Sequence, residues 1–140
     1  MPNYLMNTSL NMIEIIDNFS GEIIGNALYY FATNENNEVV FIIDNIEISN
    51  KHKPSYEVSK ELRKAITQYA SNICKEITGK DYTTIYLGTQ FNDIKIFDKT
   101  VEERIKFLGE LDCERIYLDA FEGWKNTFAL DKKLNLYKLN

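Results

Sequence analysis

The first fifty residues contain no lysine and no arginine, although the whole chain of 140 residues contains 16. The acidic residues in the same stretch are Glu14, Asp17, Glu22, Glu35, Glu38, Asp44 and Glu47. The formal net charge of the chain is −5, so the remaining ninety residues carry a net charge of +2. Clustered cations bind nucleic-acid backbones, and their absence here argues against a nucleic-acid partner. The distribution favours a basic protein partner or an amine substrate, unless the acids simply form a solvated face.

Cysteine and histidine are scarce. The two cysteines, Cys74 and Cys113, have apolar neighbours, and no second cysteine or histidine lies at metal-ligand spacing. This pattern predicts two reduced, unbridged thiols, no metal site and a cytoplasmic protein. His52 is the only histidine, so neither a catalytic triad nor a zinc site is predicted.

Long hydrophobic runs are also missing. No apolar stretch approaches the roughly 20 residues that a membrane-spanning helix needs, and the first residues lack the basic start of a signal peptide. The chain has no repeats, no low-complexity tract and only two prolines. Hydrophobic residues make up 44% and charged residues 26%, which is a globular balance. We therefore expect one domain, residues 1–140, with no membrane partner.

Two segments rich in β-branched and aromatic residues predict strands, at Glu22–Phe31 and at Glu38–Ile48. The turn-forming residues Asn34–Asn37 separate them, so the two strands are expected to pair as an antiparallel hairpin. The short apolar run Met12–Ile16 is either a further strand or part of a first helix.

The clearest helix is predicted at Tyr56–Ile77, because apolar residues recur there at three- and four-residue spacing. The residues expected to pack on the sheet are Leu62, Ile66, Tyr69 and Ile73. Ser55 stands at the start of this helix and Gly79 just past its end, where capping residues of these types are favoured.

After this helix the sequence predicts a strand at Tyr82–Thr89, a second helix at Thr100–Leu108 and two strands at Arg115–Ala120 and Leu134–Leu139. Glu103 is placed to complete a capping box with the first residue of the second helix. The predicted fold class is α+β, with a mixed, mostly antiparallel sheet flanked by helices.

From Gly25 to about Ala120, the order of elements and the local sequence resemble the GNAT family of N-acyltransferases. The segment FIIDNIEISNKHK, Phe41–Lys53, looks like that family's fourth strand and the loop that leaves it. The resemblance implies a GNAT-like fold and acetyl-CoA as the cofactor. It also implies that main-chain groups of three residues pair with the pantetheine arm, namely Ile46, Glu47 and Ile48.

The phosphate-binding loop departs from the family pattern. Family members carry Arg/Gln-x-x-Gly-x-Gly/Ala there, so that backbone N–H groups close on the pyrophosphate at a helix N-terminus. Residues 50–57 of this chain read NKHKPSYE and contain no glycine. Lys51 and Lys53 would then supply positive charge through their side chains, and Ser55 at the helix start completes the set of cofactor-binding residues. The alternative is that these residues only decorate a strand-to-helix loop.

Acyl transfer to an amine needs a base that takes the ammonium proton. The family often uses a glutamate on its fourth strand, and the resemblance gives this role to Glu47, with Asp44 as the second choice. The family's general acid is often a tyrosine on the helix that corresponds to residues 101–108, which has no tyrosine here. Tyr117 and Tyr86 are the substitutes on other elements.

Two functions fit these observations. The first is an acyl-CoA-dependent N-acyltransferase acting on an amine, for example a protein lysine or N-terminus drawn to the acidic half. The second is a non-catalytic relative that has lost cofactor binding and serves as a protein-binding module or inhibitor, which the glycine-free loop favours. Pro54 and Tyr56 would then fill the cleft beside Ile46–Ile48. Asn92 and Asp93 are expected either to line a cleft or to form a turn.

Overall fold

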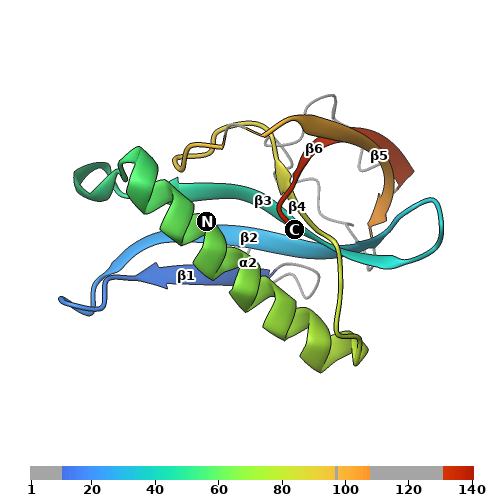
Figure 1. The fold of residues 1–140 in the computed structure, drawn as a ribbon, viewed down its shortest axis with the longest axis horizontal. Helices are drawn as coiled ribbons and strands as arrows, with labels where there is room; N and C mark the ends of the chain where they lie inside the picture. The colour runs from blue at the N-terminus through green and yellow to red at the C-terminus, as the bar shows by residue number, and fades with distance from the viewer. Residues whose placement is uncertain (1–10, 97, 108–130) are drawn as a thin grey trace.

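The computed structural model describes residues 11–96, 98–107 and 131–140. Its elements are strands β1 (Asn11–Ile16), β2 (Ile23–Thr33) and β3 (Val39–Ile48), the single-turn helix η1 (Asn50–His52), helix α2 (Tyr56–Thr78), and strands β4 (Ile85–Gly88), β5 (Thr100–Phe107) and β6 (Asp131–Lys138). The strands form one sheet in the order β1-β2-β3-β4-β6-β5. The part of the chain that the structure describes is therefore α+β, with a mostly antiparallel sheet and one α-helix across one of its faces (Figure 1).

The first three strands form an antiparallel meander. This confirms the predicted hairpin and shows that Met12–Ile16 belongs to a strand. In the turn between β2 and β3, the side-chain oxygen of Asn34 accepts hydrogen bonds from the N–H groups of Asn36 and Glu38, each at 3.0 Å. Asn37 takes a left-handed backbone conformation with φ 60, which asparagine tolerates better than most residues. The turn chemistry read from the sequence is therefore the chemistry that closes the hairpin.

Helix α2 has the predicted bounds to within one residue. The Ser55 hydroxyl accepts a hydrogen bond from the N–H of Val58 at 3.3 Å, and Gly79 ends the helix in a left-handed conformation with φ 74. The helix connects β3 to β4, which pair in parallel. Such a pairing needs a crossover connection, and the helix supplies it.

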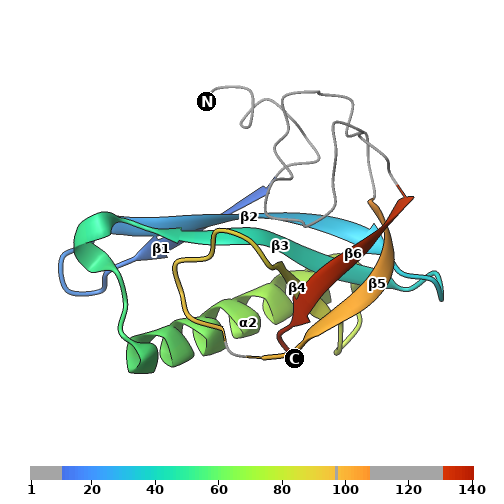
Figure 2. The same cartoon turned by 90° about the horizontal axis from the view of Figure 1, so that it is seen from above.

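The predicted contact face of α2 is confirmed only in part. Ile66 is buried, and Leu62 and Ile73 pack against the core, but Tyr69 is 52% exposed. The other buried residues of α2 have small side chains, namely Ser59, Ala70 and Cys74. Periodicity identified the correct side of the helix, which lies along one face of the sheet (Figure 2).

The sheet separates two hydrophobic cores. One lies between α2 and the sheet and contains buried residues such as Ile13, Phe41 and Ile46. The other lies on the opposite face, where β2 pairs with β5 as well as with β3, so that β2, β3, β4, β6 and β5 close into a ring. The buried residues of this second core come from all five strands: Tyr30, Ala32, Val40, Ile42, Tyr86, Ile105, Leu134 and Leu136.

The second predicted helix is wrong, because residues 100–107 form strand β5. This strand pairs antiparallel with β6 from Thr100 opposite Tyr137 to Lys106 opposite Asp131. Exposed and less exposed residues alternate along it, up to the fully buried Ile105. Long-range pairing with β6 thus outweighs the local capping pattern. The predicted final strand is confirmed as β6, whereas the strand predicted at 115–120 and Cys113 lie outside the described residues.

Candidate functional site

The candidate site lies where β3 and β4 separate. The two strands pair only over Phe41–Ile43 and Ile85–Leu87. β4 ends at Gly88, whereas β3 continues to Ile48. The last part of β3 therefore extends beyond its ladder with β4, at the place that the resemblance assigned to the pantetheine arm.

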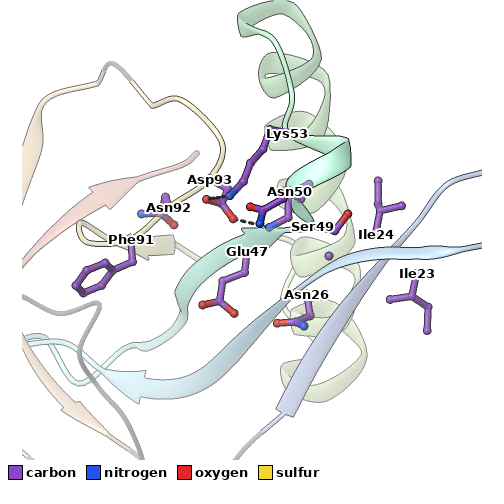
Figure 3. Close-up of a pocket in the computed structure, with 12 residues that line it drawn as sticks. Ile23, Ile24, Asn26, Glu47, Ser49, Asn50, Lys53, Phe91, Asn92 and Asp93 are labelled. Atoms are coloured by element: carbon purple, nitrogen blue, oxygen red, sulfur yellow. Dashed lines mark hydrogen bonds and ion pairs between the residues drawn. The ribbon is translucent and has the colours of Figure 1, made fainter.

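Two side chains from the segment after β4 bind this part of β3. Asn92 Oδ1 accepts a hydrogen bond from the Ile46 N–H at 2.9 Å, and Asp93 Oδ2 accepts one from the Ile48 N–H at 2.6 Å. The Asp93 N–H donates to the carbonyl oxygen of Ile46 at 2.8 Å. Asn92 Nδ2 in turn donates to the carbonyl oxygen of Gly88 at 2.6 Å. Figure 3 shows Asn92 and Asp93 beside the end of β3.

The chain therefore satisfies two of the main-chain donors that the resemblance assigned to a cofactor. Asn92 and Asp93 occupy the space beside Ile46 and Ile48 that Pro54 or Tyr56 was expected to fill. Tyr56 is instead exposed at the start of α2, where Lys60 Nζ lies 4.8 Å from the centre of its ring.

Lys53 has an acidic partner in the same segment. Its Nζ lies 2.5 Å from Asp93 Oδ1. Burial acts to raise the pKa of Asp93, but the hydrogen bonds from Lys53 and from the Ile48 N–H together outweigh it and lower that pKa. The other residues predicted to bind the cofactor phosphates behave differently: Lys51 is exposed in η1, and Ser55 caps α2.

A pocket of 700 Å³ opens beside the end of β3 (Figure 3). Its walls come from the start of β2, the end of β3, the η1 segment and the segment after β4. The lining residues are Ile23, Ile24, Gly25, Asn26, Glu47, Ile48, Ser49, Asn50, Lys53, Phe91, Asn92 and Asp93. The charge of Lys53 is balanced by Asp93, so Glu47 leaves the lining with a net negative charge.

A β-bulge determines which way the predicted catalytic acids face. The register gives β3 one extra residue relative to β2 between Ile43 and Ile46, so both of these isoleucines face the α2 side. Glu47 points to the opposite face and is exposed, whereas Asp44 is buried with 3% of its surface exposed. The two acids thus occupy different environments. Tyr117, the predicted acid, lies outside the described residues.

Tyr86 is not brought to the pocket. It is buried in the core enclosed by the strand ring. Burial, with the nearby charge of Glu103, raises its pKa to about 12. A phenol with so high a pKa, away from Glu47, is not placed to exchange a proton with a group bound in the pocket.

Glycine is required at position 25, at the wall of the pocket. A Cβ there would collide with the carbonyl oxygen of Glu47 and would lie 2.7 Å from Ile48 Cδ1. Gly25 pairs with Ile48 across β2 and β3. The absence of a side chain therefore lets the two strands approach closely beneath the pocket.

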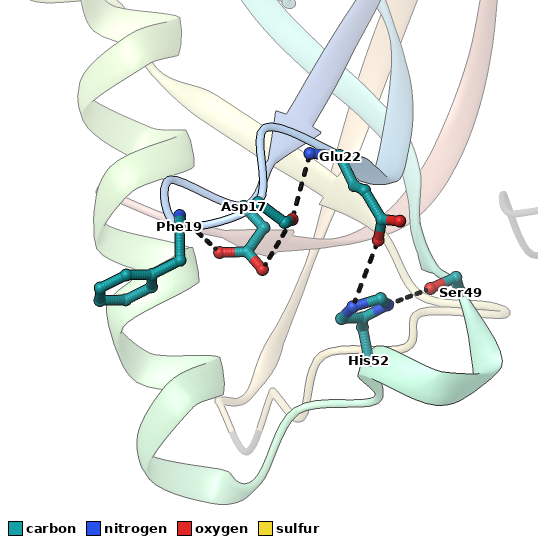
Figure 4. A network of polar contacts seen from close by, with 6 residues as sticks. Asp17, Phe19, Glu22, Ser49 and His52 are labelled. Carbon is teal, nitrogen blue, oxygen red and sulfur yellow. Dashed lines mark hydrogen bonds and ion pairs between the residues drawn. The ribbon is translucent and has the colours of Figure 1, made fainter.

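The β1–β2 turn is tied to η1 beside the pocket (Figure 4). Asp17 Oδ1 accepts a hydrogen bond from the Phe19 N–H at 3.0 Å, and this bond is the first cause of the lowered pKa of Asp17. His52 Nε2 lies 4.0 Å from Glu22 Oε2, and His52 Nδ1 lies 2.8 Å from the Ser49 hydroxyl. Figure 4 shows the Phe19 ring pointing away from this network, into solvent.

Phe91 is a pocket residue that the sequence did not single out. It takes a left-handed backbone conformation with φ 61, and its side chain is largely exposed. Phenylalanine disfavours this conformation, so no local pattern marks the position. Asn92 and Asp93, which the sequence left as either cleft or turn residues, do line the cleft.

Within residues 11–96, 98–107 and 131–140, no three or more His, Cys, Asp or Glu side chains are grouped to hold a metal ion. In the same ranges, no helix combines the length and the apolar character needed to cross a membrane. The sequence matches no family model and no curated protein, and the fold matches no solved structure.

Proposed function

We propose that this protein is a non-catalytic binding protein, and that it holds a basic segment of a partner protein in the pocket beside β3. The observation that most supports this function is the use of the Ile46 and Ile48 N–H groups within the chain. Pantetheine pairing of the type that the resemblance implies needs such donors to be available to the ligand. Releasing them from Asn92 and Asp93 would leave part-buried donors without partners until the ligand arrived.

The charge around the pocket favours a cationic partner. Glu14, Asn26 and Glu47 are direct neighbours on β1, β2 and β3, so their side chains share one face of the sheet. Glu14 and Glu47 are both exposed. Neighbouring strands are about 4.8 Å apart, so the backbone positions of Glu14 and Glu47, two strands apart, are separated by roughly 10 Å. A basic segment crossing the strands would meet both carboxylates.

An acyl-CoA-dependent N-acyltransferase is the second candidate. The exposure of Glu47 beside the pocket favours it, because a general base for an incoming amine needs such a position. This function requires Asn92 and Asp93 to leave β3 before acetyl-CoA binds. It also requires Lys53 to exchange Asp93 for a phosphate, with Lys51 assisting.

Calorimetric titration of the full chain with a short oligolysine peptide and with acetyl-CoA separates the two candidates. We expect the peptide to bind with an affinity that falls as salt is added, and acetyl-CoA not to bind. Glu47→Gln should weaken peptide binding about threefold, because one exposed ion pair contributes about 0.6 kcal/mol.

The matched control is Glu76→Gln, which removes an exposed carboxylate from α2 and should leave the affinity unchanged. Binding of acetyl-CoA without binding of the peptide would overturn the proposal in favour of the acyltransferase. Equal losses in the two variants would show that the peptide responds to net charge and not to this pocket.

A further inference from the structure

Phe91 combines two unfavourable features at the wall of the pocket. Its backbone is left-handed, with φ 61, and its side chain is 65% exposed. A bulky side chain in this conformation costs free energy, and an exposed ring recovers little of it through burial. Strained residues of this kind concentrate at sites where a ligand is bound.

The surrounding hydrogen bonds hold Phe91 in place. Asn45 Nδ2 donates to the Phe91 carbonyl oxygen at 3.3 Å. The next two residues, Asn92 and Asp93, are fixed to the Ile46 and Ile48 main chain. The backbone of Phe91 is thus held to β3 at its own carbonyl group and through the two residues that follow it, and Phe91 lines the pocket.

Phe91 shares the pocket with the carboxylate of Glu47. Asn45 is the second of the two residues at the bulge and Glu47 follows it by two positions, with Ile46 between them facing α2, so Asn45 and Glu47 face the other side of the sheet and lie roughly 7 Å apart along the strand. Phe91 is bonded to Asn45, and Phe91 and Glu47 both line the pocket (Figure 3). An aromatic face and a carboxylate in one pocket are complementary to an organic cation.

We propose that the ring of Phe91 and the carboxylate of Glu47 together hold one cationic side chain, an alkylammonium or a guanidinium, of the bound segment. This inference rests on the function proposed above and names the group that the pocket recognises. Anions are disfavoured because the one cation in the pocket lining, Lys53, is paired with Asp93. A purely apolar group would leave the Glu47 charge without a partner.

The test is titration of the full chain with oligolysine, oligoarginine and a free diamine, using wild type and three phenylalanine variants. Phe91→Leu keeps an apolar side chain of similar size but removes the aromatic face, and Phe91→Ala removes both. Phe19→Ala is the control, since Phe19 is an exposed phenylalanine that does not line the pocket. We expect both Phe91 variants to bind the peptides about two- to fivefold more weakly, and Phe19→Ala to bind as wild type.

A spectroscopic measurement separates ring contact from a change in folding. The ε-methylene protons of a bound oligolysine should shift upfield in the wild-type complex, because they lie over an aromatic face, and this shift should vanish with Phe91→Leu. Wild-type affinity in Phe91→Leu together with weakened binding in Glu47→Gln would overturn this inference and leave the proposed binding of a basic segment standing. Failure of wild type to bind either peptide would overturn both. Binding of the diamine as tightly as the peptides would assign the pocket to a free polyamine instead of a polypeptide.

Discussion

Replacing Asp93 by alanine should destabilise the protein by releasing the segment after β4 from β3. The Asp93 side chain accepts a hydrogen bond from the Ile48 N–H at 2.6 Å and forms an ion pair with Lys53. A hydrogen bond to a charged acceptor contributes about 1.5–3 kcal/mol. The Lys53 side chain is 44% exposed and that of Asp93 is 24% exposed, so solvent limits the ion pair to about 0.2–1 kcal/mol. We expect Asp93→Ala to lower the free energy of unfolding by about 2–4 kcal/mol.

Lys53→Ala provides the matched comparison. It removes the ion pair but leaves the hydrogen bond between Asp93 and the Ile48 N–H, so it should cost at most about 1 kcal/mol. Urea unfolding of the two variants and of wild type, followed by circular dichroism, measures both losses, and an unchanged slope against urea shows that the comparison is valid. Equal losses in the two variants would refute the reasoning, because the main-chain bond to Ile48 would then contribute nothing beyond the surface ion pair.

Three further predictions concern the same region. Gly25→Ala should lower the free energy of unfolding by about 1–3 kcal/mol or more, measured in urea, because the new Cβ collides with the Glu47 carbonyl oxygen; wild-type stability would contradict the close approach of β2 and β3. Phe91→Gly should be more stable than Phe91→Ala by about 1 kcal/mol, because only glycine relieves the left-handed backbone when both variants lack the ring; the reverse order in thermal unfolding would show that position 91 is unstrained. The pKa of Asp93 is lowered in the folded protein, so its contribution to the free energy of unfolding is fully present above its ordinary pKa of 3.8 and is lost as the pH falls from there through the folded-state value. Wild type should therefore lose more stability over this acid range than Asp93→Asn. Parallel curves of stability against pH for the two proteins would argue against the lowered pKa.

The local elements of this fold were readable because their signals lie close together in the sequence. The hairpin of β2 and β3 follows from two β-rich segments around Asn34–Asn37, and the bounds of α2 follow from Ser55, Gly79 and the apolar spacing between them. The turn and capping signals act through hydrogen bonds between residues that are at most a few positions apart.

Segment 100–107 shows where local signals fail. Its residues fit a capped helix, yet they form β5, since pairing with β6 and burial of Ile105 in the strand ring stabilise the extended form. Tyr69 shows the same limit on a smaller scale, because it fits the apolar spacing of α2 but is 52% exposed, whereas the small residues Ala70 and Cys74 are buried. Neither outcome is visible without the partner that the segment meets in the folded chain.

The sequence by itself determined the acidic character of the first fifty residues, which supply β1, β2 and β3, since composition is a property of the chain alone. The direction in which Glu47 faces depends on the bulge in the pairing of β3 with β2. Only the tertiary structure decided how the end of β3 is used. Asn92 and Asp93 reach Ile46 and Ile48 across separations of 46 and 45 residues, and no spacing rule links residues so far apart. The conformation of Phe91 is likewise opposed to its own preference, and hydrogen bonds at its carbonyl oxygen and at Asn92 and Asp93 hold this segment against β3.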